Sequence, residues 1–205
     1  MFSDLMKHHS IIQINRQFIK LIREKFNNKI NVAQYIIERL IFEDIRIAYS
    51  HKIINLDNNL YTDNYLFKIA KRHKTFELIY NKSALVMGQK ALTYAKIFRN
   101  SGVIFGPYAR FDKLSVPLYH GFSYGYPIVL ITLYDRIEPV KIMPIDYFIK
   151  DAHSVNESVR FPHLLEYMIV LSKLPRPGPV HLNILNDVLT DPVNLDDIGH
   201  YPVNN

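Results

Sequence analysis

The sequence predicts an α+β protein: an N-terminal bundle of about four helices, then a small antiparallel β-meander, one further helix and an extended C-terminal arm. Three observations support this fold class. Apolar residues recur at helical spacing over residues 1–100, the period becomes strand-like after Gly102, and Pro and Asn are frequent in residues 174–205. We expect a basic helical region (1–100) to share one core with the meander and its helix (101–173), and residues 174–205 to form the arm.

The first two helices are predicted from apolar stripes that short polar segments interrupt. Between Ser10 and Phe26 the apolar positions follow a helical period, and "NNK" then breaks the helix. Asn31 is a good N-cap for a second helix, which we expect to continue to about Ser50.

Two more helices are expected before residue 100. A short one begins near Asp63 and ends in "KRHK" (71–74), where cations complement the helix dipole. Thr75 can cap the next helix, which we expect to run until "NSG" (100–102) stops it.

The predicted meander comes from four segments rich in Val, Ile, Tyr and Phe: "GVIFGPYARF", "KLSVPLY", "YPIVLITLY" and "PVKIMPIDYFI". The third is apolar at both odd and even positions, which indicates a central strand covered on both faces. A last helix is predicted over Phe161–Lys173, because Pro162 suits a first turn and the prolines of "LPRPGP" stop the helix.

The C-terminal arm contains apolar residues that can dock against a protein surface. Ordering a backbone costs about 1–2 kcal/mol per residue, so an ordered arm needs compensating contacts from its own body or from a neighbour. The predicted docking residues are Val180, Leu182, Leu185, Leu189, Leu195 and Ile198.

Composition excludes several classes of protein. The 205 residues contain no Cys, so disulfides, zinc–thiolate sites, iron–sulfur clusters and cysteine nucleophiles are ruled out. The longest mainly apolar run, "YPIVLITLY", has nine residues, whereas a membrane-spanning helix needs about 20. The opening "MFSDLMKHHS" lacks the pattern of a secretory signal. We therefore expect no membrane partner.

Catalytic motifs are missing from the sequence. It contains no P-loop, no paired-glycine dinucleotide motif, no HExxH and no G-x-S-x-G. We therefore predict a non-enzymatic protein without catalytic, cofactor-binding or metal-binding residues. An enzyme with an unfamiliar site near Asp112, His120 and Asp135 remains an alternative.

Charge divides the chain into two unlike halves. Residues 1–100 carry 17 Lys or Arg and 8 Asp or Glu, a net of +9, whereas residues 101–205 carry 8 and 11, a net of −3. A basic surface of this kind faces either nucleic-acid phosphates or an acidic protein. The candidate contacts are Arg16, Lys20, Arg23, Lys71, Arg72 and Lys74.

An aromatic segment suggests an interface. The glycines of "YHGFSYGYP" allow a tight loop, and together with "GPYARF" it offers flat rings beside few cations. Tyr is favoured at protein interfaces, and aromatic rings also stack on bases. The predicted interface residues are Tyr108, Arg110, Phe122, Tyr124 and Tyr126.

These features lead to one functional hypothesis and its alternatives. We expect a structural subunit of a large macromolecular assembly that docks to the same or different chains through its arm. The bias toward Ile, Asn, Lys, Tyr and Phe is common in AT-rich genomes. It favours a virion portal, neck, tail-ring or connector component, found in the virion or the host cytoplasm. The alternatives are an organellar complex in the mitochondrial matrix and a nucleic-acid-binding or ribosome-associated protein.

Overall fold

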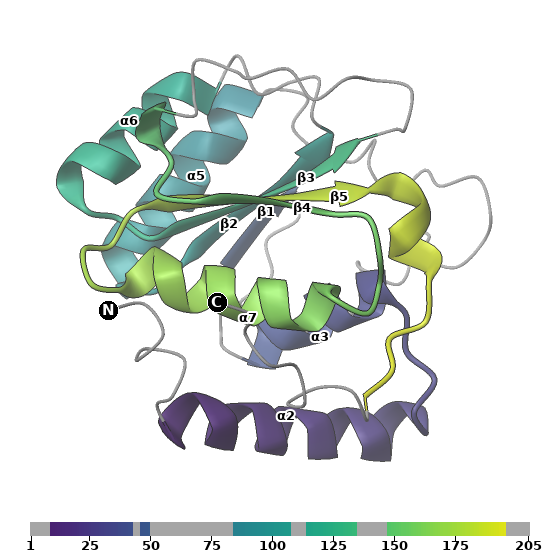
Figure 1. Cartoon of the computed structure of the whole chain (residues 1–205). Coiled ribbons are helices and arrows are strands. Elements are labelled where there is room, and N and C mark those ends of the chain that lie inside the picture. The colour runs from purple at the N-terminus through teal and green to yellow at the C-terminus, as the bar shows by residue number, and fades with distance from the viewer. Residues whose placement is uncertain (1–8, 43–45, 50–83, 108–113, 135–146, 196–205) are drawn as a thin grey trace.

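The computed structural model describes residues 9–42, 46–49, 84–107, 114–134 and 147–195. In these ranges the chain forms an α/β fold with a five-stranded sheet between layers of helices (Figure 1). The strands are β1 (Arg46–Tyr49), β2 (Gly102–Pro107), β3 (Ile128–Tyr134), β4 (Ala152–Val155) and β5 (Pro179–Leu185), in the spatial order β1-β2-β3-β5-β4. Every pair of neighbouring strands is parallel. The predicted α+β fold is therefore wrong, both in its N-terminal bundle of about four helices and in its antiparallel meander.

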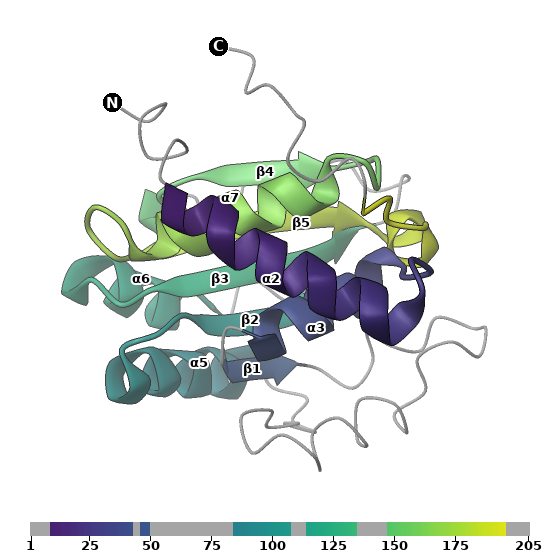
Figure 2. The same cartoon turned by 90° about the horizontal axis from the view of Figure 1, so that it is seen from below.

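Helices cover both faces of the sheet. They are α2 (His9–Phe26), α3 (Val32–Phe42), α5 (Ala84–Phe98), α6 (Ser115–Tyr124) and α7 (Phe161–Lys173), with a short 3-10 helix η4 (Asn186–Thr190). α5 and α6 lie over one face, and α3 and α7 lie over the other (Figure 1). Seen from below, α2 crosses outside α3 and α7 (Figure 2). No helix in the ranges given above is long and apolar enough to cross a bilayer.

The direction in which the chain winds explains why the helices occupy both faces. The chain moves from β1 to β2 and β3 through α5 and α6, and it returns in the opposite direction from β4 to β5 through α7. Crossovers between parallel strands are right-handed, so reversing the direction moves the helix to the other face. Because the strands are parallel, they all start at the same side of the sheet, which we call the amino edge. They all end at the opposite side, which we call the carboxyl edge.

β3 shows why a run of apolar residues is needed in the centre of such a sheet. Val129 and Ile131 pack into the core beneath α3 and α7, whereas Ile128 and Leu130 pack into the core beneath α5 and α6. All four side chains are buried. The prediction that this segment is a central strand covered on both faces is confirmed.

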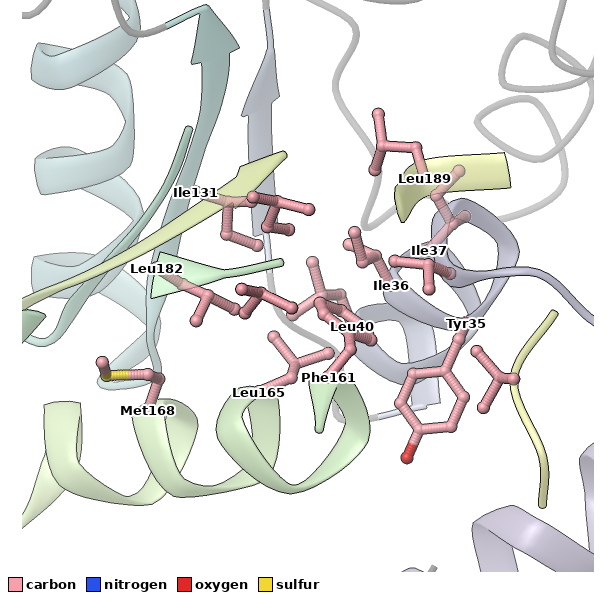
Figure 3. Close-up of a cluster of buried hydrophobic side chains, with 14 of the residues drawn as sticks. Tyr35, Ile36, Ile37, Leu40, Ile131, Phe161, Leu165, Met168, Leu182 and Leu189 are labelled. Carbon is pink, nitrogen blue, oxygen red and sulfur yellow. The ribbon is translucent and has the colours of Figure 1, made fainter. Parts of the chain in front are cut away.

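The larger core lies between the sheet, α3 and α7 (Figure 3). α3 contributes Tyr35 and Leu40, and α7 contributes Phe161 and Leu165. Tyr35 meets the Phe161 ring edge-on, with ring centres 6.0 Å apart. α2 packs against the outer side of α3. The outermost helix is therefore attached to the sheet through α3.

The start of α3 is fixed by a reciprocal pair of hydrogen bonds. The Gln34 backbone N–H donates to Asn31 Oδ1 over 2.9 Å, and the Asn31 N–H donates to Gln34 Oε1 over 3.2 Å. This is a capping box, and it confirms Asn31 as the N-cap. The predicted continuation of this helix to Ser50 is wrong, because α3 ends at Phe42 and residues 46–49 form the edge strand β1.

A buried ion pair ties α3 to α7. Arg39 Nε donates to Glu166 Oε1, and Arg39 Nη2 donates to Glu166 Oε2 over 2.6 Å. The side chains are only 2% and 7% exposed. The Arg39 guanidinium also lies 5.4 Å from the Phe18 ring centre and 5.8 Å from that of Phe42. One arginine thus connects α2, α3 and α7.

The Tyr35 hydroxyl lies in the same cluster and is buried. It has no hydrogen-bond partner among the described residues. Burial raises the pKa of Tyr35 well above its usual value, and the nearby Glu166 carboxylate adds to this effect.

α6 occupies a segment for which a strand and a loop are predicted. Its buried side contains Pro117, Leu118 and Gly121. A Cβ on Gly121 would lie 2.8 Å from Ile128 Cδ1 and 3.1 Å from Pro179 Cγ, so only glycine lets the helix approach β3 and β5 this closely. Gly125 ends the helix in the left-handed conformation, with φ of 68°.

The segment predicted as an extended arm is part of the core. Pro179–Leu185 forms β5, which pairs with β3 on one side and β4 on the other. The chain then returns to α3, where Val193 N–H donates to Ile30 O over 2.9 Å. The docking residues Val180, Leu182, Leu185, Leu189 and Leu195 are all buried in the chain's own core, and Ile198 lies outside the described residues. The prediction of an arm that leaves the body is therefore wrong.

The other predicted helices are partly covered by the structure. α2 and α7 match the predicted ranges closely, and α5 lies within the helix predicted after Thr75. The short helix predicted near Asp63 lies outside the described residues. Of the fourth predicted strand (139–149), only residues 147–149 are described.

Candidate functional site

The outer side of α6 carries exposed aromatic rings. Helical spacing places Pro117, Leu118 and Gly121 on the buried sheet side of α6, whereas its exposed residues face outward. Tyr124 is 69% exposed. Tyr147, whose neighbour Phe148 packs beside this helix, is 83% exposed.

These rings form a continuous surface. Phe148 contacts Tyr119 and Phe122, with ring centres 5.3 and 6.5 Å apart. The contacts continue through His120 to Tyr124 at 5.7 Å and from Tyr124 to Tyr126 at 6.2 Å. We call this set the aromatic surface; it comprises Tyr119, His120, Phe122, Tyr124, Tyr126, Tyr147 and Phe148.

Arg176 holds one end of the aromatic surface in place. Its guanidinium lies 5.7 Å from the Phe122 ring centre. Arg176 Nη2 also lies 3.4 Å from Ser123 O, near the C-terminus of α6. A stacked cation of this kind is typical of protein interfaces, which are enriched in Tyr, Phe and Arg.

A second group of side chains breaks the apolar pattern of the sheet. Thr132 on β3, Asn183 on β5 and Ser154 on β4 are register partners, so they point to the same face. His181 lies two residues before Asn183 on β5 and therefore points to that face as well. Thr132, His181 and Asn183 are buried, whereas Ser154 is exposed. We call these four residues the polar row.

Hydrogen bonds fix the proton positions within the polar row. Thr132 donates its hydroxyl proton to Asn183 Oδ1. Thr132 Oγ1 therefore accepts from His181 Nε2, 2.8 Å away, which must carry a proton. Burial lowers the pKa of His181 from 6.5 to about 4, so the ring is neutral at neutral pH. His181 cannot serve as a base toward Thr132, because its nitrogen there is already protonated.

A third cluster lies where β4 begins. Asp151 Oδ2 accepts from the Tyr167 hydroxyl over 3.0 Å and lies 3.2 Å from His153 Nε2, while Asp151 Oδ1 accepts from the Ala152 N–H. Burial, followed by Asp151, raises the pKa of Tyr167 to about 12. Asp151 thus joins the edge strand to α7, and the cluster has a structural explanation.

Only some of the basic residues that are predicted to contact phosphates or an acidic protein lie within the described residues. Arg16, Lys20 and Arg23 lie at helical spacing on α2 and are exposed. Lys71, Arg72 and Lys74 lie outside the described residues.

The other predicted site residues are divided in the same way. Phe122, Tyr124 and Tyr126 meet in the aromatic surface, whereas Tyr108 and Arg110 lie outside the described residues. Of the alternative enzyme site, His120 belongs to the aromatic surface, and Asp112 and Asp135 lie outside the described residues. Within the described ranges, no group of three His, Cys, Asp or Glu is placed to hold a metal ion.

The polar row was not found from the sequence. Its signal is a His and an Asn at alternate positions of the apolar segment "PVHLNIL", together with Thr132 inside "YPIVLITLY". Polar residues at interior positions of a buried strand are uncommon, so they mark a candidate site once the strand is recognised.

Comparisons with known proteins show the fold alone. No protein-family model matches the chain, and no curated protein matches it. The chain is similar to an X-ray structure of a protein from Mycobacterium smegmatis assigned as a thiamin diphosphate-dependent enzyme, with a TM-score of 0.61 and 13% identity. The match covers 86% of this chain and 34% of that chain. The chain thus spans about a third of the protein it resembles, and the likeness agrees with the α/β fold.

Proposed function

We propose that the chain is a subunit of a larger protein assembly and that it contacts a neighbouring protein through the aromatic surface. The observation that supports this is the gathering of seven ring-bearing side chains over α6 and residues 147–148, several of them largely exposed. Contiguous exposed apolar groups on a protein mark interaction sites, because leaving them in water is unfavourable.

The aromatic surface replaces the C-terminal arm as the contact region of this proposal. The arm residues are used inside the chain's own core, whereas Tyr119, Tyr124 and Tyr147 are exposed. The narrower proposal, a virion connector component, continues to rest on the compositional bias of the sequence. The fold is also compatible with the organellar alternative.

The test is site-specific photo-crosslinking in the particles or cells that contain the protein. A photoreactive phenylalanine analogue is placed at position 124 or 147, and the control carries it at Gln17, an exposed position on α2. We expect a discrete crosslinked protein at positions 124 and 147 and none at position 17. A similar pattern at all three positions, or no product at 124 and 147, contradicts the proposal.

The second candidate function is binding of nucleic-acid phosphates by α2. Arg16, Lys20 and Arg23 form one exposed stripe on the outermost helix, and the first turn of that helix contains no acidic residue. A line of cations along a helix matches the repeating charge of a phosphate backbone.

This candidate is tested by the salt dependence of binding to a double-stranded DNA fragment. Three phosphate contacts contribute about 2.7 to the slope of log K against log salt, and the triple variant Arg16→Gln, Lys20→Gln, Arg23→Gln is expected to lose that contribution. Arg160→Gln, which changes an exposed arginine at the N-cap of α7, is the matched control and should keep the slope. Equal slopes in both variants, or no binding at low salt, would dismiss the idea.

The likeness to a thiamin diphosphate-dependent enzyme does not extend to the polar row. The polar row contains neither a carboxylate for a divalent cation nor a cation for a diphosphate. These residues do not fit that cofactor, so we derive no reaction from the resemblance.

A further inference from the structure

We propose that the amino edge of the sheet holds a binding pocket for a small phosphate-bearing molecule with a flat ring, of the mononucleotide class. The cavity there has a volume of about 480 Å³, within the usual range for small-molecule sites. Its lining consists of Ala95, Lys96, Arg99, Gly125, Tyr126, Pro127, Lys173 and Pro177. The pocket is separate from both the polar row and the basic stripe of α2.

The topology explains why cations gather at this edge. α5, α6 and α7 all end where β2, β3 and β5 begin (Figure 1). Each helix C-terminus carries a partial charge of about −0.5, so cations there have a structural role as well. Three cationic side chains line the cavity and no acidic one does. The side chains of the lining are therefore positive on balance.

The conformation of Arg99 supports a role for its side chain. Arg99 follows α5 with φ of 50°, a left-handed conformation that glycine adopts at much lower cost. Arginine gives the backbone no advantage at this position. Arg99 lines the pocket, and phosphate binding is a reason for an arginine to stand here, because a guanidinium binds phosphate through several donors in a fixed plane.

The pocket is built on loops that are held rigidly together. Gly102 N–H donates to Pro127 O over 3.0 Å, which joins the loops before β2 and β3. The Ser101 and Ser172 hydroxyls are 2.9 Å apart and both buried, which joins the first loop to α7. Because these loops are already ordered, binding costs little additional conformational entropy.

The lining also provides an apolar side for a ring. Tyr126, Pro127 and Pro177 form this part of the cavity, and the Tyr126 ring is supported by Tyr124 at 6.2 Å. A planar base can stack on a tyrosine ring. A phosphate would then lie toward Lys96, Arg99 and Lys173.

The experiment measures binding of AMP, adenosine and inorganic phosphate to the full chain by calorimetry at low ionic strength. We expect AMP to bind about tenfold or more tightly than either of its parts, since both sides of the pocket contribute. Arg99→Gly should weaken AMP binding about tenfold. It should leave the unfolding temperature unchanged or raised, because it relieves the left-handed strain.

Two control variants separate binding from folding and from overall charge. Asn27→Gly relieves the same backbone strain at φ of 50° on the distant turn after α2, and it should bind AMP like the unmodified chain. Lys20→Gln removes one exposed positive charge from α2 and should also bind normally. The proposal is overturned if AMP does not bind, if phosphate alone binds as tightly as AMP, or if Arg99→Gly has no effect. It is also overturned if a glutamate-rich peptide displaces AMP and binds more tightly, since the pocket would then accept an acidic protein segment.

Discussion

Replacing Glu166 by glutamine is expected to lower the free energy of unfolding by about 4 kcal/mol, because it removes the carboxylate that pairs with the buried Arg39 guanidinium. Glutamine keeps the size of the side chain, so the loss reports charge and hydrogen bonding rather than a cavity. Urea denaturation followed by circular dichroism measures the change.

Two further variants show whether the ion pair or its surroundings cause the effect. Glu157→Gln breaks the exposed pair with Arg160 and should change the free energy of unfolding by less than about 0.5 kcal/mol. The double variant Arg39→Met, Glu166→Leu should recover most of the stability, since an apolar pair needs no desolvation of charge. A loss below about 1 kcal/mol in Glu166→Gln would contradict the role assigned to this pair.

His181 is expected to make the protein less stable in mild acid. Its pKa is about 4 in the folded chain and 6.5 when exposed, so between these values the unfolded chain binds the extra proton. Stability is therefore complete above pH 6.5 and falls as the pH decreases toward 4, by about 1.4 kcal/mol per pH unit. The total loss is about 3 kcal/mol. Urea denaturation at a series of pH values measures it.

The matched variant for this measurement is His181→Gln. Its amide N–H can still donate to Thr132, but it does not titrate, so the part of the pH dependence due to residue 181 should disappear. His120→Gln, on the aromatic surface, should keep the full dependence. If the unmodified chain and His181→Gln lose stability in parallel between pH 7 and pH 5, His181 is not the group responsible.

The elements whose ends or positions are set by local sequence signals could be predicted from the sequence. α7 begins with a proline in its first turn and ends before a run of prolines, and both are backbone effects that need no knowledge of neighbours. The Asn31 capping box is equally local. β3 was recognised because burial on both faces demands apolar residues at every position.

The errors occurred where tertiary contacts override local signals. Gly121 and Gly125 are typical loop residues, yet one lets α6 approach the sheet and the other ends the helix. β5 begins at the third of three closely spaced prolines and includes His181 and Asn183, so its sequence is not typical of a buried strand. Thr132 on β3 helps to accommodate these polar residues, because its hydroxyl forms hydrogen bonds with both His181 and Asn183.

Like the fold, the candidate sites could be predicted only in part from the sequence. The aromatic rings of "YHGFSYGYP" were predicted to form an interface on a loop; they lie largely on the helix α6 instead, and their interface role stays a prediction. The pocket at the amino edge could not be predicted, because Lys96, Tyr126 and Lys173 are far apart in sequence. They meet only because parallel strands with antiparallel helices bring three helix ends to one edge.

The position of β5 also has a consequence for how the protein is made. A ribosome synthesises β3 and β4 before β5, yet β5 lies between them and bonds to both. Until residues 179–185 have left the ribosome, β3 and β4 have no common neighbour, and their apolar edges are open to other chains. Residues 179–185 are therefore needed to complete the sheet, so β3 and β4 join into one sheet only after these residues have left the ribosome.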